Sequence, residues 1–116
     1  MLIRIDLQSG ERVYDQVATQ IAGQILVGEL EVGERLPAAR DLADALGVNM
    51  HTILHAYQRL REDGLIELRR GRGAVVIGVG GGGRLQELVA DVVEEARRHG
   101  VSQNALVALM RKAYGA

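Results

Sequence analysis

Apolar residues recur at every fourth position between residues 13 and 25, and this spacing is that of one face of a helix. Gly28 follows the stripe and is typical of a helix end. The pattern therefore predicts a helix over residues 12–27, with one face packed against a core. The stripe consists of Val13, Val17, Ile21 and Ile25, and it is widened by Tyr14, Ala18 and Leu26.

The ten residues before this helix alternate apolar and charged side chains over a short distance. Leu2, Ile3 and Ile5 surround Arg4, and alternation of this kind is typical of extended backbone. We expect residues 1–10 to form either an arm or an edge strand.

Two shorter helical patterns follow, separated by a tight turn. Pro37 lacks an amide hydrogen and has a fixed φ, so it suits the first turn of a helix, and Gly47 ends that helix. Asn49 is a favourable N-cap for the next helix, which the apolar spacing extends to about Asp63. The inward residues are Leu42, Ala43, Leu46, Ile53, Ala56, Tyr57 and Leu60. The residues left facing outward near the start of the second helix are Asn49, His51, Thr52 and His55.

A basic hairpin is predicted directly after these two helices. Residues 65–68 and 74–77 have the composition of two short strands, and Arg70-Gly71-Arg72-Gly73 separates them. Two helices joined by a tight turn also occur as an ordinary helical hairpin. The basic hairpin favours a winged helix-turn-helix instead, in which one helix enters the major groove of DNA and the wing lies on the backbone.

Residues 78–83 are nearly all glycine and are typical of a linker. They divide the chain into a predicted DNA-binding domain over residues 1–77 and a two-helix region over residues 84–116. That helix pair is too small for a core of its own, so we expect it to form a homodimer with a second copy. Packing against the first helix of the same chain is the alternative. The residues expected at the dimer interface are Leu85, Leu88, Val89, Val92, Val93, Leu106 and Leu109.

The composition fits a mainly α fold with a small β-hairpin wing, built from aliphatic residues. The 116 residues contain neither Phe nor Trp, and they contain no Cys, which excludes disulfides and thiolate metal sites. No apolar run is long enough to span a membrane, so we expect a cytoplasmic protein. The net charge is −1, but Arg69, Arg70 and Arg72 form a local cluster that can contact phosphates.

The helix-turn-helix and the wing contain a set of short motifs at fixed spacing. The motifs are Leu36-Pro37, Arg40, Leu42-Ala43, Leu46-Gly47-Val48, Asn49, Thr52-Ile53, Ala56-Tyr57, Leu60, Gly64-Leu65-Ile66 and Arg70-Gly71-Arg72-Gly73. Together they resemble the DNA-binding domain of the GntR family, and most closely its YtrA-like branch. The short C-terminal region is also similar to that branch. The resemblance implies a homodimeric transcription factor, usually a repressor, that binds an inverted-repeat operator.

The resemblance also implies roles for individual residues. Arg40, just before the turn, is expected to contact a base or a phosphate, and Arg70 and Gly71 match the wing tip that reaches the minor groove. Arg72 is expected to hold the DNA backbone with them. The first turn of the recognition helix comprises Asn49, Met50, His51 and Thr52.

Three positions depart from the family pattern. Met50 and His55 stand where relatives often have proline and a basic residue, respectively, and Ala39 stands where many relatives have a charged or polar side chain. A neutral histidine donates one hydrogen bond and carries no charge, so a phosphate contact by His55 depends on pH.

Two other sequence patterns resemble functional motifs and are excluded on physical grounds. Gly78, Gly80 and Gly83 have the spacing of a dinucleotide-binding loop, but the remaining residues read as helix and offer no second half of that fold. His51 and His55 have the spacing of a zinc helix but lack the intervening glutamate and a third ligand. We therefore expect no cofactor, no metal and no enzymatic activity.

Two non-enzymatic alternatives use the same scaffold. The apolar C-terminal helices would bind a partner in a protein–protein module. In a ligand sensor, a small molecule would lodge between the winged domain and those helices, but the sequence offers no convergent polar set there, so the effector is unknown.

Overall fold

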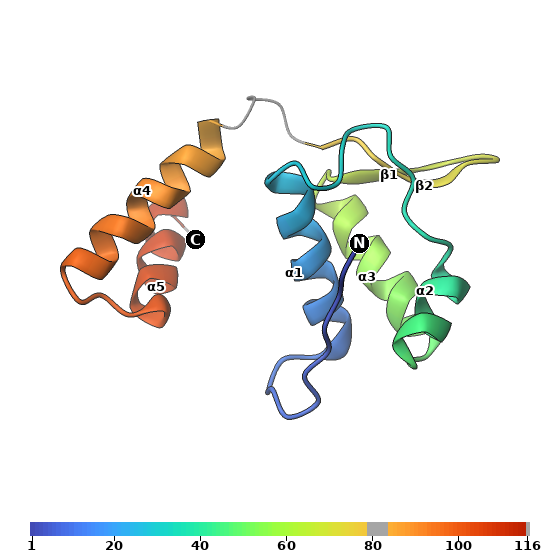
Figure 1. The fold of residues 1–116 in the computed structure, drawn as a ribbon, viewed down its shortest axis with the longest axis horizontal. Coiled ribbons are helices and arrows are strands. Elements are labelled where there is room, and N and C mark those ends of the chain that lie inside the picture. Colours follow the sequence, from blue (N-terminus) through green and yellow to red (C-terminus); the bar gives the residue numbers. More distant parts are fainter. Residues whose placement is uncertain (79–83, 116) are drawn as a thin grey trace. The chain divides into compact units, whose positions relative to one another are not determined.

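The structure, a computed structural model, describes residues 1–78 and 84–115. It forms two compact units, Met1–Gly80 and Gly81–Ala116, which we call the winged unit and the C-terminal unit. The winged unit contains α1 (Val13–Leu26), α2 (Ala39–Leu46), α3 (Met50–Glu62), β1 (Ile66–Arg69) and β2 (Gly73–Val76). The C-terminal unit contains α4 (Arg84–Arg98) and α5 (Gln103–Tyr114) (Figure 1).

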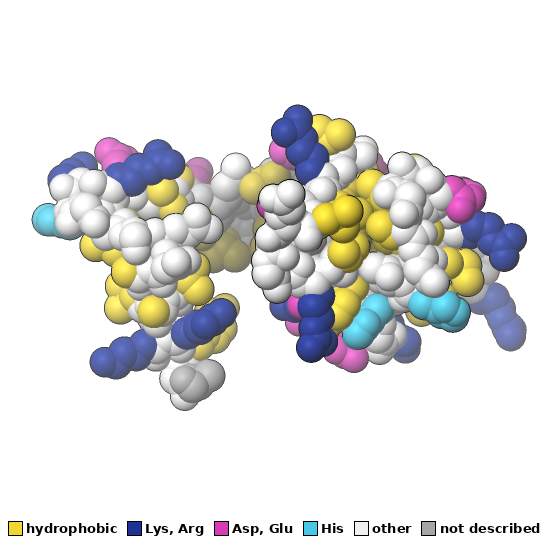
Figure 2. Space-filling view, turned by 90° about the horizontal axis from the view of Figure 1, so that it is seen from below, with side chains coloured by type: hydrophobic (Ala, Val, Ile, Leu, Met, Phe, Trp, Pro, Cys, Tyr) yellow, Lys and Arg dark blue, Asp and Glu magenta, His cyan; other side chains and the backbone are white. Residues whose placement is uncertain are grey.

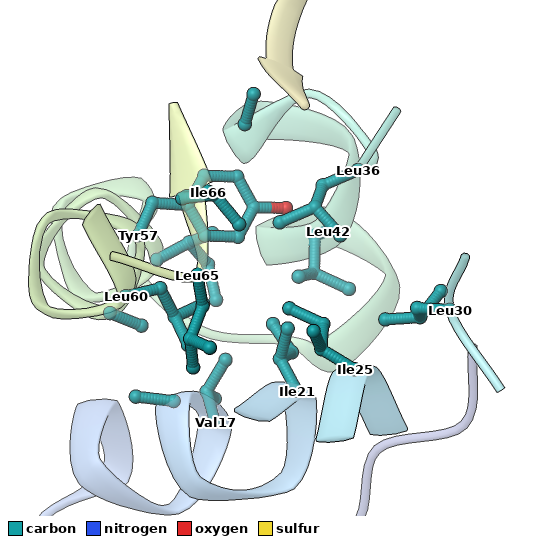
Figure 3. Close-up of a cluster of buried hydrophobic side chains, with 14 of the residues drawn as sticks. Val17, Ile21, Ile25, Leu30, Leu36, Leu42, Tyr57, Leu60, Leu65 and Ile66 are labelled. Atoms are coloured by element: carbon teal, nitrogen blue, oxygen red, sulfur yellow. The ribbon is translucent and has the colours of Figure 1, made fainter. Parts of the chain in front are cut away.

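The core of the winged unit lies where α1, α2, α3 and the hairpin meet. Ile21 of α1, Ile53 of α3 and Ile66 of β1 are almost completely buried. Figure 3 shows side chains from these helices and the sheet pointing into one cluster. Burying such a side chain contributes about 1.5–3 kcal/mol, so this cluster supplies most of the stability of the unit and fixes α3 against α1.

The winged helix-turn-helix architecture is confirmed. β1 and β2 pair antiparallel, with Ile66 opposite Val76 and Arg69 opposite Gly73. The predicted strands and helices agree with the observed ones to within two residues, because glycines mark most of their ends.

A third extended segment lies beside β2 and was not predicted. The amide of Gly33 donates to the carbonyl of Val76 at 2.7 Å, and the amide of Leu36 donates to that of Ala74 at 2.8 Å. Residues 33–36 contain no alternating apolar pattern, so no strand is predicted here. This pairing ties the chain entering α2 to the base of the wing.

We expected Pro37 to lie in the first turn of α2, but it lies outside this helix. The helix begins at Ala39, and its N-cap, Ala38, has extended backbone with φ −57° and ψ 143°. The pairing of Leu36 with β2 keeps the backbone extended beyond this point. The carbonyl of Pro37 instead accepts a hydrogen bond of 2.7 Å from the hydroxyl of Tyr57 on α3.

The N-terminal residues form an arm rather than an edge strand, and glutamines of α1 hold it. The side chain of Gln20 exchanges two hydrogen bonds with the backbone of Arg4, at 2.9 and 2.6 Å. Gln16 does the same with Asp6, at 2.8 and 2.9 Å. Four helical residues advance about 6 Å and two extended residues about 6.7 Å. Two glutamines one turn apart on α1 can therefore reach alternate residues of the arm.

The C-terminal unit buries much less. Among its described residues, 84–115, only Ala96 is buried. The amide of Val101 donates to the carbonyl of Ala96 at 2.8 Å. The predicted cap of α5 is confirmed, because the hydroxyl of Ser102 accepts from the amide of Ala105 at 3.2 Å. Hydrophobic side chains remain on the surface of this unit (Figure 2).

No helix in the described part of the chain has both the length and the apolar character needed to cross a membrane.

Candidate nucleic-acid interface

The turn between α2 and α3 presents the first turn of α3 to solvent. Gly47 adopts the left-handed conformation, with φ 69° and ψ 33°, which a side chain would disfavour. Val48 follows and packs half-buried against the core. The turn is therefore anchored by one apolar residue, and Asn49 and His51 after it are exposed.

Asn49 caps α3, as the sequence predicts. Its side-chain oxygen accepts a hydrogen bond of 2.7 Å from the amide of His51, and its carbonyl accepts one of 3.0 Å from the amide of Thr52. The cap uses the oxygen of the Asn49 side chain and leaves its amide nitrogen to donate to a ligand. Because the helix dipole is positive here, an anion is favoured beside this turn.

The other predicted residues of the recognition helix differ in exposure. His51 and His55 are exposed, Thr52 is half-buried, and Met50 is half-buried because it packs partly against the core. Figure 2 shows histidine side chains of the winged unit at the surface, near Lys and Arg side chains.

His55 is held by α1. Its imidazole stacks on the phenol ring of Tyr14, with ring centroids 3.7 Å apart and planes inclined by 13°. Next to this pair, Arg59 of α3 forms an ion pair with Asp15 of α1. The apolar spacing predicts that His55 faces outward, but it does not indicate that a residue of another helix contacts its ring.

The wing tip comprises Arg70, Gly71 and Arg72. Gly71 and Gly73 have φ of 80° and 76°, values that favour glycine, and the amide of Arg72 donates to the carbonyl of Arg69 at 3.0 Å. All three tip residues are exposed. Arg69 forms an ion pair with Glu67, so the cluster of three arginines in the sequence presents two at the tip.

A groove of about 650 Å³ runs between the start of α2, the side of α3 and the wing. Leu54 and Leu68 line it and are 45% and 57% exposed, and Arg72 lines it as well. Sequence reasoning did not single out these two leucines, because each lies in an element whose other apolar residues face the core. Arg40 is exposed at the start of α2, beside the groove-lining residues Ala39 and Asp41.

Tyr57 closes the inner side of this groove. Burial raises the pKa of its phenol well above the ordinary value of 10. The hydroxyl therefore stays protonated and donates its bond to Pro37, which joins α3 to the segment that leads into α2.

The described residues contain no cluster of three or more His, Cys, Asp or Glu side chains that could hold a metal ion.

A capped helix behind a tight glycine turn, followed by a two-stranded basic wing, defines a winged helix-turn-helix domain. Residues 13–76 match the family of bacterial regulatory proteins known as the gntR family. The chain belongs to the GntR family and carries the winged helix-turn-helix domain of its transcription regulators.

Solved structures agree with this assignment. YtrA from Sulfolobus acidocaldarius, a GntR-family transcription factor, is 37% identical with a TM-score of 0.64, over 81% of this chain and 99% of that one. The DNA-binding domain of AraR, solved in complex with operator ORX1, is 26% identical with a TM-score of 0.55, over 64% of this chain and 95% of that one.

A curated relative points to the same branch. The transcriptional repressor YtrA of Bacillus subtilis is 36% identical over 75 residues, which are 65% of this chain and 58% of the repressor. The chain spans 55% and 58% of the length of the first two curated relatives it matches. The resemblance to the YtrA-like branch is confirmed.

Proposed function

We propose that this protein binds double-stranded DNA sequence-specifically and acts as a transcriptional repressor, as a homodimer on an inverted-repeat operator. The observation that carries the proposal is the exposed start of α3, capped by Asn49, in the same compact unit as a wing whose exposed tip carries Arg70 and Arg72. In winged helix-turn-helix proteins, these elements enter the major groove and contact the adjacent backbone. The name of the Bacillus subtilis relative, the transcriptional repressor YtrA, supports the repressor role.

The first turn of α3 would read the DNA. His51 and the side-chain nitrogen of Asn49 are exposed donors that can reach base edges, and Thr52 lies beside them. Arg40 can make a bidentate contact with guanine, which is worth about 1–3 kcal/mol of discrimination.

Arg70 and Arg72 would hold the sugar–phosphate backbone or the minor groove. Because the chain has a net charge of −1, non-specific attraction to DNA is weak, and affinity depends on where the arginines lie. Contacts with phosphates fix the register of a protein on DNA, and contacts with base edges supply the sequence preference.

A single recognition helix contacts few base pairs, so a second copy is needed for a long site. Two recognition helices related by a two-fold axis would enter major grooves roughly 34 Å apart. The exposed apolar residues of the C-terminal unit would form the dimer interface and set that distance. They are Leu85, Leu88, Val89, Val92 and Leu109, with Val93 and Leu106 half-buried beside them.

Selection of bound DNA from a random pool tests the proposal. We expect enrichment of two inverted half-sites at a fixed spacing. Enrichment of single half-sites would contradict the homodimer while retaining DNA recognition. No enrichment would contradict DNA recognition itself, and recovery of a stoichiometric protein partner in its place would favour a protein–protein module.

The wing is tested by Arg72→Ala, with Arg69→Ala as the matched control, because Arg69 is already paired with Glu67. We expect Arg72→Ala to weaken specific and non-specific binding alike and to lower the slope of log affinity against log salt by about one. Fluorescence anisotropy at several salt concentrations measures both. A changed sequence preference with an unchanged salt slope would contradict the assigned role.

A further inference from the structure

The ring of His55 is placed by α1, although His55 belongs to the recognition helix. Its stack on Tyr14, at 3.7 Å and 13°, is the one aromatic pair among the described residues. Tyr14 is itself half-buried and packs against the core of the winged unit. Its phenol ring therefore contacts the core and also stacks on the imidazole of His55.

The start of α1, where Tyr14 lies, is held from several sides. Gln16, which is 6% exposed, donates to the carbonyls of Asp6 and Glu11, both at 2.9 Å, and accepts from the amide of Asp6 at 2.8 Å. On the other side, Asp15 pairs with Arg59, one turn beyond His55 on α3. The backbone that carries Tyr14 is thus tied both to the arm and to α3.

The stack leaves the hydrogen-bonding groups of His55 available. Two parallel rings touch through their faces, whereas imidazole nitrogens donate and accept in the plane of the ring. Holding the ring in one plane removes much of the rotamer entropy that a free side chain loses on binding.

We infer that Tyr14 is a positioning residue that holds the His55 imidazole for a contact with a DNA phosphate, an inference that rests on the proposed function. His55 lies one turn beyond His51 on the outward face of α3, on the side toward α1. A side chain there meets the backbone that borders the groove when the first turn of α3 enters it. Tyr14 acts through His55 and does not contact DNA.

A double-mutant cycle on the affinity of the full chain for its selected DNA tests this inference. Tyr14→Leu keeps apolar volume but removes the flat ring, and His55→Ala removes the contact. We expect each to weaken binding about fivefold, and the double variant to bind no more than about twofold worse than His55→Ala alone. Tyr14→Phe, which keeps the ring, is expected to retain most of the affinity of the parent chain.

Two controls separate this role from a general effect on folding. Urea unfolding shows whether each variant is native at the assay temperature, and Tyr14→Met replaces Tyr14→Leu if the latter does not fold. Thr19→Ala changes an exposed residue of the same helix, and we expect it to leave affinity within about twofold of the parent.

The outcomes distinguish the inference from the proposed function. If the parent chain binds selected DNA but the losses of Tyr14→Leu and His55→Ala multiply to about 25-fold, as independent sites do, the positioning role is wrong and the function stands. An unchanged affinity of Tyr14→Leu also overturns it. If the parent chain enriches no DNA, the proposed function and the inference fall together.

Discussion

The winged unit and the C-terminal unit are both made from aliphatic helices, yet they bury very different amounts of them. In the winged unit, Val17, Ile21 and Ile53 have no exposed surface. In the C-terminal unit, Leu85 and Leu109 are 55% and 60% exposed. The apolar spacing is helical in both regions. Such spacing indicates that a face will be covered, but it does not indicate what covers it.

Polar contacts do not compensate for the low burial of apolar side chains in the C-terminal unit. In the C-terminal unit, Arg98 pairs with Glu94 and Glu95 at 3.4 and 3.1 Å, and all three side chains are exposed. Exposed pairs of this kind contribute about 0.3–0.5 kcal/mol each. The helix pair therefore needs a further apolar contact, and a second copy is the partner we propose.

The largest expected effect is on the core of the winged unit. Ile21→Ala should lower the free energy of unfolding by about 3 kcal/mol, because it leaves a cavity in a packed cluster. In the C-terminal unit, Leu109→Ala should cost below about 1 kcal/mol at concentrations where the chain is monomeric. Urea unfolding measures both. Equal losses of unfolding free energy under monomeric conditions would contradict the difference in packing between the two units.

The next effect concerns assembly. Leu88→Glu places a charge in the exposed apolar stripe of α4 and should weaken dimerisation by at least about 2 kcal/mol, roughly thirtyfold in the dissociation constant. Ala90→Glu adds the same charge at an exposed position outside the stripe and should leave the dimer intact. Analytical ultracentrifugation measures both. A parent chain that stays monomeric at high concentration would contradict the proposed interface.

The smallest effect compares two tyrosines. Tyr57 is 6% exposed and bonded to Pro37, whereas Tyr114 is 88% exposed. Tyr57→Phe should cost about 1 kcal/mol, and Tyr114→Phe almost nothing. The raised pKa of Tyr57 also makes stability pH-dependent, because the phenol ionises above about pH 10 only in the unfolded chain.

The sign of this dependence follows from the raised pKa. The contribution of Tyr57 to stability is complete below about pH 10 and is lost as the pH rises above that value. Unfolding free energies measured from neutral to alkaline pH should therefore decline less steeply in Tyr57→Phe than in the parent. Identical alkaline slopes would show that Tyr57 ionises equally in both states.

Local signals explain why so much of the fold was predictable. Gly47 and Asn49 mark the turn by their own backbone preferences, and Ser102 caps α5 in the same way. These preferences depend on a few neighbouring residues, so they can be read from the sequence. The family resemblance rests on the same short motifs.

Contacts between distant residues were not predictable. Nothing in residues 33–36 indicates that they would pair with β2, and this pairing is the reason that Pro37 lies outside α2. The stack of His55 on Tyr14 depends on how α1 packs against α3. The groove likewise forms because α2, α3 and the wing lie next to one another. The local pattern of each element does not predict that arrangement.

The glutamines that hold the arm make it sensitive to the replacement of a single atom. The nitrogen of the Gln16 side chain donates to two carbonyls, those of Asp6 and Glu11. Deamidation to glutamate would exchange that nitrogen for an oxygen and bring negative charge against both acceptors. Deamidation of this one buried amide would therefore free the part of the arm around Asp6 and loosen the start of α1.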